Sequence, residues 1–566
     1  MAAGVIFMMK LKKTLKKVFT LSFFLFAYYP GTGTDAWAHT NITPDEARAL
    51  ISNPGREFIV VDVREENEYC SGHIPCAVLL PWRSGILRER YNELSEDAEI
   101  YVICRSGSRS NDAANFLDSM GFSRVFDIKG GMSLWNGEKT ACTDTAPFLY
   151  FPHIASRDGW ETEICVISGT SDHQITGSFK AYDHNGTLVS EMTVPSLPPN
   201  SRMEITVGTS FENPQDIRYI VFDSSSGFVR GYQNFHTNGT YRVAVPAVRE
   251  INMEDQIFIP HIASDSEWWT GISLLNTGAS PAALTIIFDN GETKELALSA
   301  HKHKAFTVRD LFGGTPKPDI HSAVIKNARG ITGLELFGST SDSNMDYLSG
   351  ILLTGAAAHT ELVYPHVASD DRWWTGIAAF NPSADTCTFR IQPYSEEGTL
   401  LEPVILEIES GSRYSATAVD IGLPHGTAWF KTEASTPVTG FELFGTKDGQ
   451  GLGGYTVLHS GIKRGIFAKL EDNGWTGIAL VNLSEDTAHV SFSAFNDSGG
   501  IIAEETVSIA PFSRYADMPG NVFTGDISEA TYILFSADRE MAGFQLNGSF
   551  DGMMLDGIPL LDYRGL

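Results

Sequence analysis

The segment Ile100-Tyr101-Val102-Ile103-Cys104-Arg105-Ser106-Gly107-Ser108-Arg109-Ser110 decides how the first part of this chain folds. Its first four residues form a continuous apolar run of the kind found in buried strands. An amphipathic helical pattern follows from Asn111 to Met120 and ends at Gly121. A strand that enters a helix through a tight polar loop points loop N–H groups and the helix N-terminus at one spot. The segment therefore predicts an anion cradle that contains a cysteine.

The position of Cys104 favours a reactive thiolate. The dipole of the following helix and the guanidinium groups of Arg105 and Arg109 stabilise negative charge on its sulfur. A buried structural cysteine beside a solvated turn is the alternative, but two arginines, one glycine and three serines follow this thiol. The pattern predicts a nucleophile that binds an oxyanion. The candidate site consists of Cys104 as nucleophile and of Arg105, Ser106, Gly107, Ser108, Arg109 and Ser110 as the substrate-binding loop.

The segments around this loop predict a small α/β domain over residues 40–140. Thr43-Pro44-Asp45-Glu46 has the form of a capping box with proline at the first helical position, so a helix is expected through Ala47–Ile51. The run from Phe58 to Val63 has the continuous β-branched character of a buried strand. Ala77–Leu80 forms a further short apolar run.

Three motifs in this order resemble the rhodanese domain of sulfurtransferases. Asp62-Val63-Arg64-Glu65, followed by Tyr69 and Gly72-His73-Ile74-Pro75, is similar to its N-terminal signature. Cys104 to Ser110 is similar to its active-site loop, and Gly130-Gly131-Met132 with Trp135 to its C-terminal signature. The resemblance implies a doubly wound parallel sheet. It also implies that Cys104 accepts a sulfane sulfur as a persulfide and passes it to a thiophilic acceptor in two half-reactions with ping-pong kinetics.

The length of the loop separates two enzymatic alternatives. Four residues lie between Cys104 and Arg109, whereas related phosphatases of this fold carry five. The shorter cradle suits a sulfur atom better than a phosphoryl group, so phosphatase activity is the weaker option.

Other residues of this domain are expected to serve structure. Asp62 and Arg64 are interpreted as a structural ion pair, and Trp82 and Trp135 as core or pocket wall. One departure from the family pattern is a cysteine at position 76 where glycine is usual, with Cys70 six residues earlier. These two thiols could pair or could resolve a persulfide on Cys104, but small apolar fillers are the favoured interpretation.

The N-terminus predicts export. Five lysines between Lys10 and Lys17 precede a 12-residue apolar run from Val18 to Tyr29. Spanning a bilayer takes about 20 apolar residues, so a signal-peptide core fits better than a membrane anchor. Ala36-Trp37-Ala38 has the small residues that a signal peptidase requires, which predicts cleavage after Ala38. We expect residues 1–38 to be removed and the mature protein to be periplasmic or secreted, without membrane insertion.

Composition and charge restrict the classes of function. The chain has 566 residues, 41 Lys+Arg and 69 Asp+Glu, and a formal net charge of −28. Binding to nucleic acid needs clustered cations, so this acidic balance disfavours it. Six cysteines without a CxxC pair give poor support for a disulfide scaffold or a zinc site. We therefore expect no metal and no cofactor, and the pairing of Cys70, Cys76, Cys142, Cys165 and Cys387 stays open.

The remaining sequence repeats one unit four times. Phe151-Pro152-His153-Ile154-Ala155 recurs as Ile259-Pro260-His261-Ile262-Ala263 and as Tyr364-Pro365-His366-Val367-Ala368, and a degenerate copy reads Phe467-Ala468-Lys469-Leu470. A tryptophan segment follows in each copy. The expected units cover residues 148–250, 251–358, 359–462 and 463–566.

Within a unit the pattern is β. Leu284 to Phe288 leads into Asp289-Asn290-Gly291, and Ser491 to Phe495 alternates before Asn496-Asp497-Ser498-Gly499. Short strands separated by such turns, in units of about 105 residues, have the size of an immunoglobulin-like sandwich. A propeller blade needs only about 40–50 residues and fits badly. The predicted fold is thus an α/β rhodanese-like domain followed by four all-β sandwich repeats.

Chemistry in the repeats has weaker support. His153, His261 and His366 lie on separate units, and the fourth copy has Lys469, so hydrogen-bonded structural histidines are favoured over a shared metal site. One tryptophan of each pair is expected in a core, and the other could form a carbohydrate or peptide platform. Residues sharing one register are interpreted as cross-strand partners: Gln233, Glu335, Glu442 and Gln545.

Two hypotheses for function follow. The first is an exported sulfurtransferase that moves sulfane sulfur from a donor such as thiosulfate, a small anion, to a thiol or cyanide acceptor through Cys104. The second is a non-catalytic periplasmic or surface protein whose repeats bind a protein or glycan partner and whose cysteine domain senses redox state or sulfide. The intact loop favours the first.

Overall fold

The computed structural model describes residues 39–52, 56, 58–65, 68–69, 72–75, 77–83, 85–95, 98–139, 148–170, 174–237, 239–249, 252, 254–353 and 358–563. The predicted signal peptide with its cleavage site after Ala38, and the thiols of Cys70, Cys76 and Cys142, lie outside the described residues. Within the described residues, no helix combines the length and the apolar character that crossing a membrane requires.

The first part of the chain is an α/β domain built on one parallel sheet. Its five strands run in the order β1-β5-β4-β2-β3, and every neighbouring pair is parallel. They are β1 (Thr40–Ile42), β2 (Phe58–Asp62), β3 (Val78–Leu79), β4 (Glu99–Ile103) and β5 (Val125–Ile128). The helices are α1 (Pro44–Ser52), α3 (Ile86–Arg90), η1 (Tyr91–Glu93), α4 (Ser108–Ser119) and α5 (Gly131–Leu134).

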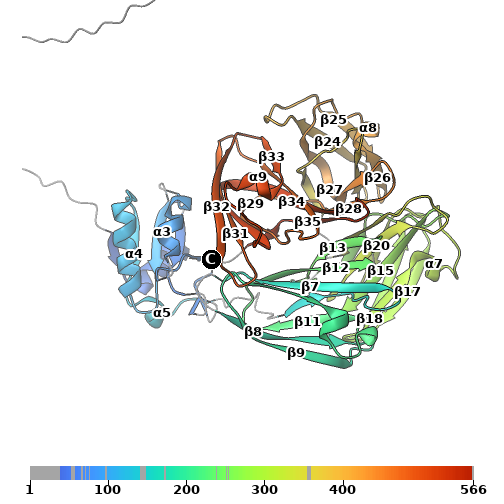
Figure 1. The fold of residues 1–566 in the computed structure, drawn as a ribbon. Coiled ribbons are helices and arrows are strands. Elements are labelled where there is room, and N and C mark those ends of the chain that lie inside the picture. The colour runs from blue at the N-terminus through green and yellow to red at the C-terminus, as the bar shows by residue number, and fades with distance from the viewer. Residues whose placement is uncertain are drawn as a thin grey trace, which may run out of the picture.

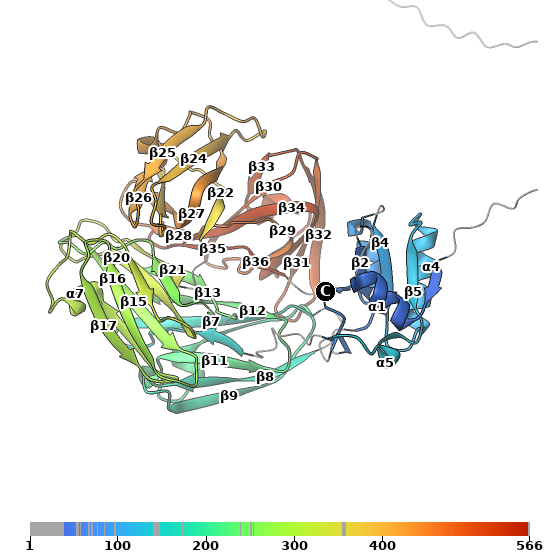
Figure 2. The same cartoon turned by 180° about the vertical axis from the view of Figure 1, so that it is seen from behind.

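Helices cover both faces of this sheet, as Figures 1 and 2 show. Val102 of β4 packs in one core cluster with Leu87 of α3 and Leu117 of α4. Tyr101 packs in the other cluster with Ala47 of α1 and Met132 of α5. Successive strand residues point to opposite faces, so the run Ile100–Ile103 needs apolar side chains throughout. The prediction of a doubly wound parallel sheet is confirmed.

The rest of the chain is almost entirely antiparallel β structure, arranged in four consecutive groups of strands. Group 1 contains β6 (Phe148–Phe151), β7 (Trp160–Ser168), β8 (Ile175–Tyr182), β9 (Leu188–Leu197), β10 (Arg202–Thr206), β11 (Tyr219–Ser224), β12 (Val229–Thr237) and β13 (Arg242–Pro246). Group 2 contains β14 (Gln256–Ile259), β15 (Trp268–Asn276), β16 (Ala282–Phe288), β17 (Thr293–Leu298), β18 (His303–Thr307), β19 (Ala323–Lys326), β20 (Ile331–Ser339) and β21 (Leu348–Leu353).

The two later groups use longer strands. Group 3 contains β22 (His359–Tyr364), β23 (Trp373–Phe380), β24 (Cys387–Tyr394), β25 (Val404–Ile408), β26 (Arg413–Thr417), β27 (Trp429–Thr446) and β28 (Leu452–Thr456). Group 4 contains β29 (Ile462–Phe467), β30 (Gly474–Asn482), β31 (Ala488–Phe495), β32 (Ile501–Ile509), β33 (Arg514–Asp517), β34 (Tyr532–Ser549), β35 (Leu555–Pro559) and β36 (Leu561–Asp562). Short helical turns join strands in every group: α6 (Val207–Ser210), η2 (Pro214–Asp216), α7 (Val308–Leu311), α8 (Ala418–Ile421) and α9 (Pro519–Val522).

Each of the first two groups holds two four-stranded sheets, β10-β7-β12-β13 with β6-β11-β8-β9, and β18-β15-β20-β21 with β14-β19-β16-β17. In groups 3 and 4, β27 and β34 have 18 residues each and take part in both layers, which joins the strands into a seven-stranded and an eight-stranded sheet. Aliphatic and aromatic side chains fill the space between the two layers of each group.

The last long strand of each group pairs in the same register. The paired residues are Gln233 with Val245, Glu335 with Ile351, Glu442 with Tyr455, and Gln545 with Ile558. All four of the predicted cross-strand residues are buried. The predicted shared register is therefore confirmed.

The four groups close into a ring. Strands β13, β21, β28 and β35 lie where the groups meet, and each contacts the next, with β35 returning to β13. Figure 2 shows these four strands gathered between the groups. Side-chain interactions between the groups accompany these strand contacts. For example, Arg202 of group 1 forms an ion pair with Asp497 of group 4, with 3.0 Å between the charged atoms.

Trp268 and Trp269 lie on opposite sides of their strand, as expected for neighbours, but neither lies in the core between the layers of its own group. Trp268 and Trp269 are both half-buried, and they pack in two different clusters between groups. Trp269 lies with Trp160 between groups 1 and 2, and Trp268 lies near Tyr347 between groups 2 and 3. The ring is the physical reason, because it places a neighbouring group against each side of the strand end that carries both indoles.

Candidate active site

Cys104 lies directly after the carboxyl end of β4, at the centre of the parallel sheet. Its residue is only 1% exposed. Gly107 is the N-cap of α4 and has a φ of 98°, a left-handed conformation that glycine adopts without strain. This turn directs the backbone N–H of Gly107 at the sulfur, with 3.1 Å between N and Sγ. The thiol thus sits in the predicted cradle at the start of a 12-residue helix.

The floor of the loop is held by the first turn of α5. The N–H of Met132 donates to the carbonyl oxygen of Cys104 at 2.8 Å, and the N–H of Ser133 donates to that of Arg105 at 2.9 Å. Gly131 has a φ of 53°, and a Cβ on it would overlap the carbonyl oxygen of Cys104. The motif Gly130-Gly131-Met132 therefore lets a helix N-terminus approach the backbone of the loop closely enough to fix it.

Arg109 is bound to an acidic partner that sequence reasoning missed. Its guanidinium donates to both carboxylate oxygens of Glu68, at 2.7 and 2.8 Å. The hydrogen bonds from Arg109 hold the pKa of Glu68 below its usual value. The same bonds, together with nearby negative charge that includes Cys104, raise the pKa of Arg109. Two-point pairing of this kind fixes the plane of the guanidinium.

The remaining predicted site residues differ in their exposure to solvent. Arg105, Ser106 and Ser108 are exposed on the rim of the loop. Ser110 is fully buried, and its hydroxyl has no hydrogen-bond partner among the described residues. The rim therefore has one exposed guanidinium and two exposed hydroxyl groups close to Cys104 in sequence.

The N-terminal motif positions Glu68. Arg64 pairs with the buried carboxylate of Asp62 at 2.7 Å. It also donates to the carbonyl oxygens of Glu68 at 2.7 Å and Gly72 at 2.9 Å. The prediction that Asp62 and Arg64 form a structural ion pair is confirmed, and the pair anchors the segment that carries the partner of Arg109.

The two tryptophans of the domain have the expected structural places. Trp135 is 6% exposed and packs in the core with α1 and α5. Trp82 is partly buried, and the guanidinium of Arg88 lies 3.7 Å from its ring centroid.

The described cysteines besides Cys104 are buried and free, namely Cys165 and Cys387. Burial raises the pKa of Cys165 to about 12, which keeps this thiol protonated and unreactive. Because Cys70 and Cys76 lie outside the described residues, their interpretation as apolar fillers stays a prediction.

The three motif histidines lie at three different contacts between groups. His153 faces His303 at 3.3 Å between nitrogens, His366 faces Arg514 at 2.9 Å, and His261 contacts Arg413. Burial lowers the pKa of His153 to about 4 and that of His366 to about 3. Structural, hydrogen-bonded histidines are therefore confirmed. In the described part of the chain, no group of three His, Cys, Asp or Glu side chains could hold a metal ion.

Comparison with known proteins identifies the class of this domain. The family model described as "Rhodanese-like domain" matches residues 43–138. The chain therefore belongs to the rhodanese-like family through this domain.

Three of the relatives illustrate the similarity, and each matches less than a fifth of this chain. "Putative sulfur carrier protein YrkF" of Bacillus subtilis is 44% identical over 79 residues, which span 14% of this chain and 42% of the relative. "Putative sulfurtransferase YtwF" of the same organism is 43% identical over 14% of this chain and 77% of the relative. "Thiosulfate sulfurtransferase GlpE" of Pseudomonas entomophila is 36% identical over 17% of this chain and 82% of the relative.

Proposed function

We propose that this protein is a sulfurtransferase that carries sulfane sulfur as a persulfide on Cys104. The observation that carries the proposal is the position of the sulfur, 3.1 Å from the N–H of Gly107 and at the N-terminus of α4. A sulfur that bears negative charge is stabilised there by backbone dipoles that need no reorganisation during the reaction.

In the first half-reaction, the Cys104 thiolate attacks the outer sulfur of a donor such as thiosulfate. An S–S bond forms to Cys104 while the S–S bond of the donor breaks, and sulfite leaves with the bonding electron pair. The terminal sulfur of the persulfide then extends about 2 Å beyond Sγ into the loop. The exposed guanidinium of Arg105 supports a role in binding the anionic end of the donor.

In the second half-reaction, the thiolate of an acceptor, or cyanide, attacks the terminal sulfur. The persulfide bond breaks, and the Cys104 thiolate leaves with its electrons, so the enzyme returns to its first form. Arg109, held by Glu68, contributes fixed positive charge beside the loop in both steps.

The experiment is thiocyanate formation from thiosulfate and cyanide by the full chain, with Cys104→Ser as the inactive variant. Mass spectrometry after incubation with thiosulfate alone should find a mass increase of about 32 Da on the peptide that contains Cys104. Cys165→Ser is the matched control, because that thiol is buried and should leave transfer unchanged. Equal activity of Cys104→Ser and the parent protein would overturn the proposal.

We also propose that the protein is exported, on the basis of the basic and apolar N-terminal segment that ends at Ala38. The four groups of strands are proposed to be copies of one immunoglobulin-like sandwich, within the boundaries 148–250, 251–358, 359–462 and 463–566. The matching registers of the last strands in all four groups support this. N-terminal sequencing of the secreted protein tests the cleavage site.

A second candidate function is binding by the β groups, with the cysteine domain as a redox or sulfide sensor. The cavities between groups favour it, and the one between groups 1 and 2 has a volume of about 550 Å³. This function is favoured if transfer is absent with every donor while the β groups still bind a ligand.

A further inference from the structure

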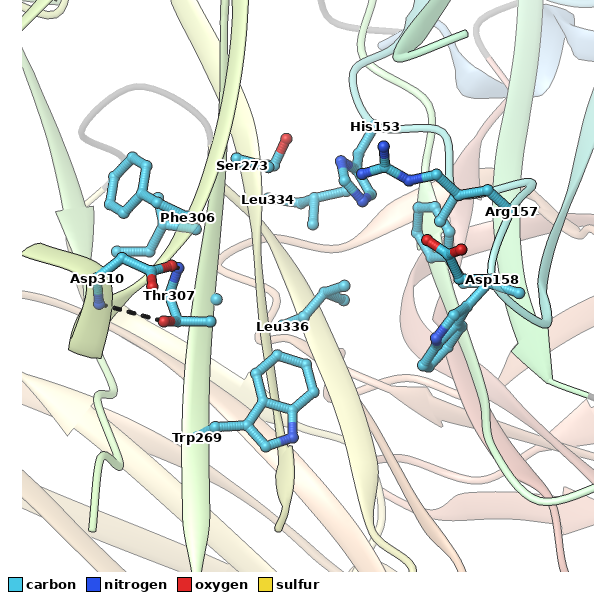
Figure 3. Close-up of a pocket in the computed structure, with 16 residues that line it drawn as sticks. His153, Arg157, Asp158, Trp269, Ser273, Phe306, Thr307, Asp310, Leu334 and Leu336 are labelled. Atoms are coloured by element: carbon cyan, nitrogen blue, oxygen red, sulfur yellow. Dashed lines mark hydrogen bonds between the residues drawn. The ribbon is translucent and has the colours of Figure 1, made fainter. Parts of the chain in front are cut away.

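A cavity of about 550 Å³ lies between groups 1 and 2, and it is mostly lined by apolar side chains. Figure 3 shows Trp269, Phe306, Leu334 and Leu336 around it. Cavities of this size and character are the common form of small-molecule sites. We refer to it as the Trp269 cavity.

Trp269 forms a rigid aromatic surface in this cavity. Its indole lies across two glycines on neighbouring strands, and a Cβ on Gly271 would lie 3.1 Å from the ring and one on Gly338 3.2 Å from Nε1. The indole N–H donates to the carbonyl oxygen of Ser339 at 3.1 Å. One face of the ring is thus packed on backbone and its polar atom is bonded, so the part of the indole that lines the cavity is held in place.

The charges around the cavity favour a cation. Carboxylates of Asp158 from group 1 and Asp310 from group 2 line it, and only Arg157 opposes them. In Figure 3 the carboxylate of Asp158 is directed into the cavity from one side, and Asp310 stands on the other. Burial keeps His153 neutral at pH 7, because its pKa is about 4. One oxygen of Asp310 accepts the backbone N–H of Thr307 at 2.7 Å, which fixes that side chain in place.

We propose that the Trp269 cavity binds a small organic cation that carries an aromatic ring, such as an arylalkylamine. The ring packs against the part of Trp269 that lines the cavity, where stacking and dispersion stabilise it. The ammonium group is attracted by the carboxylates on the two sides of the cavity and gains further from the electron-rich indole. This site is independent of Cys104 and of sulfur transfer.

Equivalent positions in the ring provide controls. Trp374 lies on Gly376 and Gly445 in the same way, and its cavity of about 320 Å³ includes Asp420. No residue equivalent to Asp158 lines that cavity. Trp475 lies on Gly548, but it contacts Trp373 edge-on at 6.1 Å between centroids. The Trp269 cavity thus has an indole and two carboxylates in its lining.

The test is isothermal titration of the full chain with 2-phenylethylamine and, separately, with phenylacetate, which has the same ring and the opposite charge. We expect the amine to bind about tenfold or more tightly than the acid. Trp269→Ala and Asp158→Asn should each weaken amine binding by about tenfold, and Trp475→Ala should leave it unchanged.

Because Asp158 is exposed, Asp158→Asn is expected to fold even if Trp269→Ala does not. Three results would overturn the proposal: no saturable binding of the amine, equal binding of amine and acid, or loss of binding in Trp475→Ala equal to that in Trp269→Ala.

Discussion

The guanidinium of Arg109 is held by both carboxylate oxygens of Glu68, at 2.7 and 2.8 Å, although the two residues lie 41 positions apart in sequence. Glu68 in turn belongs to a segment that Arg64 anchors through its carbonyl oxygens. Two motifs far apart in the chain therefore act as one unit beside the cysteine loop. Pairing with Glu68 orients the guanidinium of Arg109 through side-chain hydrogen bonds.

Replacing Arg109 by lysine tests this orientation. Lysine keeps the charge but cannot pair with both oxygens of Glu68, so we expect kcat/KM for thiosulfate to fall by about tenfold. Steady-state thiocyanate formation measures the change. Arg48→Lys is the control, because Arg48 is a surface residue paired only with exposed Asp45. Unchanged kinetics in Arg109→Lys would mean that its fixed geometry is irrelevant.

Gly131→Ala should disrupt the floor of the loop. The new Cβ would overlap the carbonyl oxygen of Cys104, in addition to the strain of a φ of 53°. We expect a loss of roughly 3 kcal/mol in the free energy of unfolding of this domain and a large loss of transfer activity.

Gly121→Ala is the matched control for that change. Gly121 also has a positive φ, 99°, but no atom lies within 4 Å of an added Cβ. Its cost should be only the strain of a left-handed alanine, about 1 kcal/mol, with activity kept. Urea unfolding of both variants separates strain from overlap, and equal costs would contradict the overlap.

The buried histidines predict a loss of stability in acid. Burial and the nearby charge of Arg514 lower the pKa of His366 to about 3. A histidine whose folded pKa is depressed stabilises the fold fully above the unfolded value of about 6.5, and this contribution falls as pH drops toward 3. The slope is up to roughly 1.4 kcal/mol per pH unit.

His366→Gln removes this titration. Its free energy of unfolding should therefore depend less on pH than that of the parent between pH 6 and 4, as measured by urea unfolding at several pH values. Identical slopes for both proteins would show that His366 does not titrate as described.

The contact between groups 4 and 1 should depend on buried charge. Lys469 lies 3.4 Å from Glu163 and 3.2 Å from Glu204, and its side chain is 12% exposed. Lys469→Met leaves both carboxylates without this partner, so we expect a loss of about 3 kcal/mol in the free energy of unfolding. Adding Glu163→Gln should recover part of the loss, and a double variant as unstable as the sum of both changes would contradict the pairing.

Local sequence patterns were sufficient to predict the cysteine loop and the strands around it. The run Ile100–Ile103 and the loop from Cys104 are determined by neighbours in the chain, so periodicity and loop chemistry suffice. The start of the next helix was predicted three residues too late, because α4 begins at Ser108 and takes Ser108, Arg109 and Ser110 into its first turn. The pairing of Asp62 with Arg64 was also predictable, because they lie two positions apart within one motif.

Contacts between distant segments were not predictable in the same way. Nothing in the sequence around Glu68 indicates that its carboxylate pairs with Arg109. In the same way, the strand pattern within one group does not indicate which other group will pack against it. One signal was present: Glu161, Glu163 and Lys469 all depart from the pattern of the other copies, and the ring brings these three to one contact.

Closure of the ring has a consequence for how this chain can change in length. In a linear array each end leaves one face uncovered, so units can be added or lost with little effect on the others. Here β35 returns to β13, so every group contacts a neighbour on either side. Deleting one group would break two of the contacts that close the circle and expose the surfaces that now meet there.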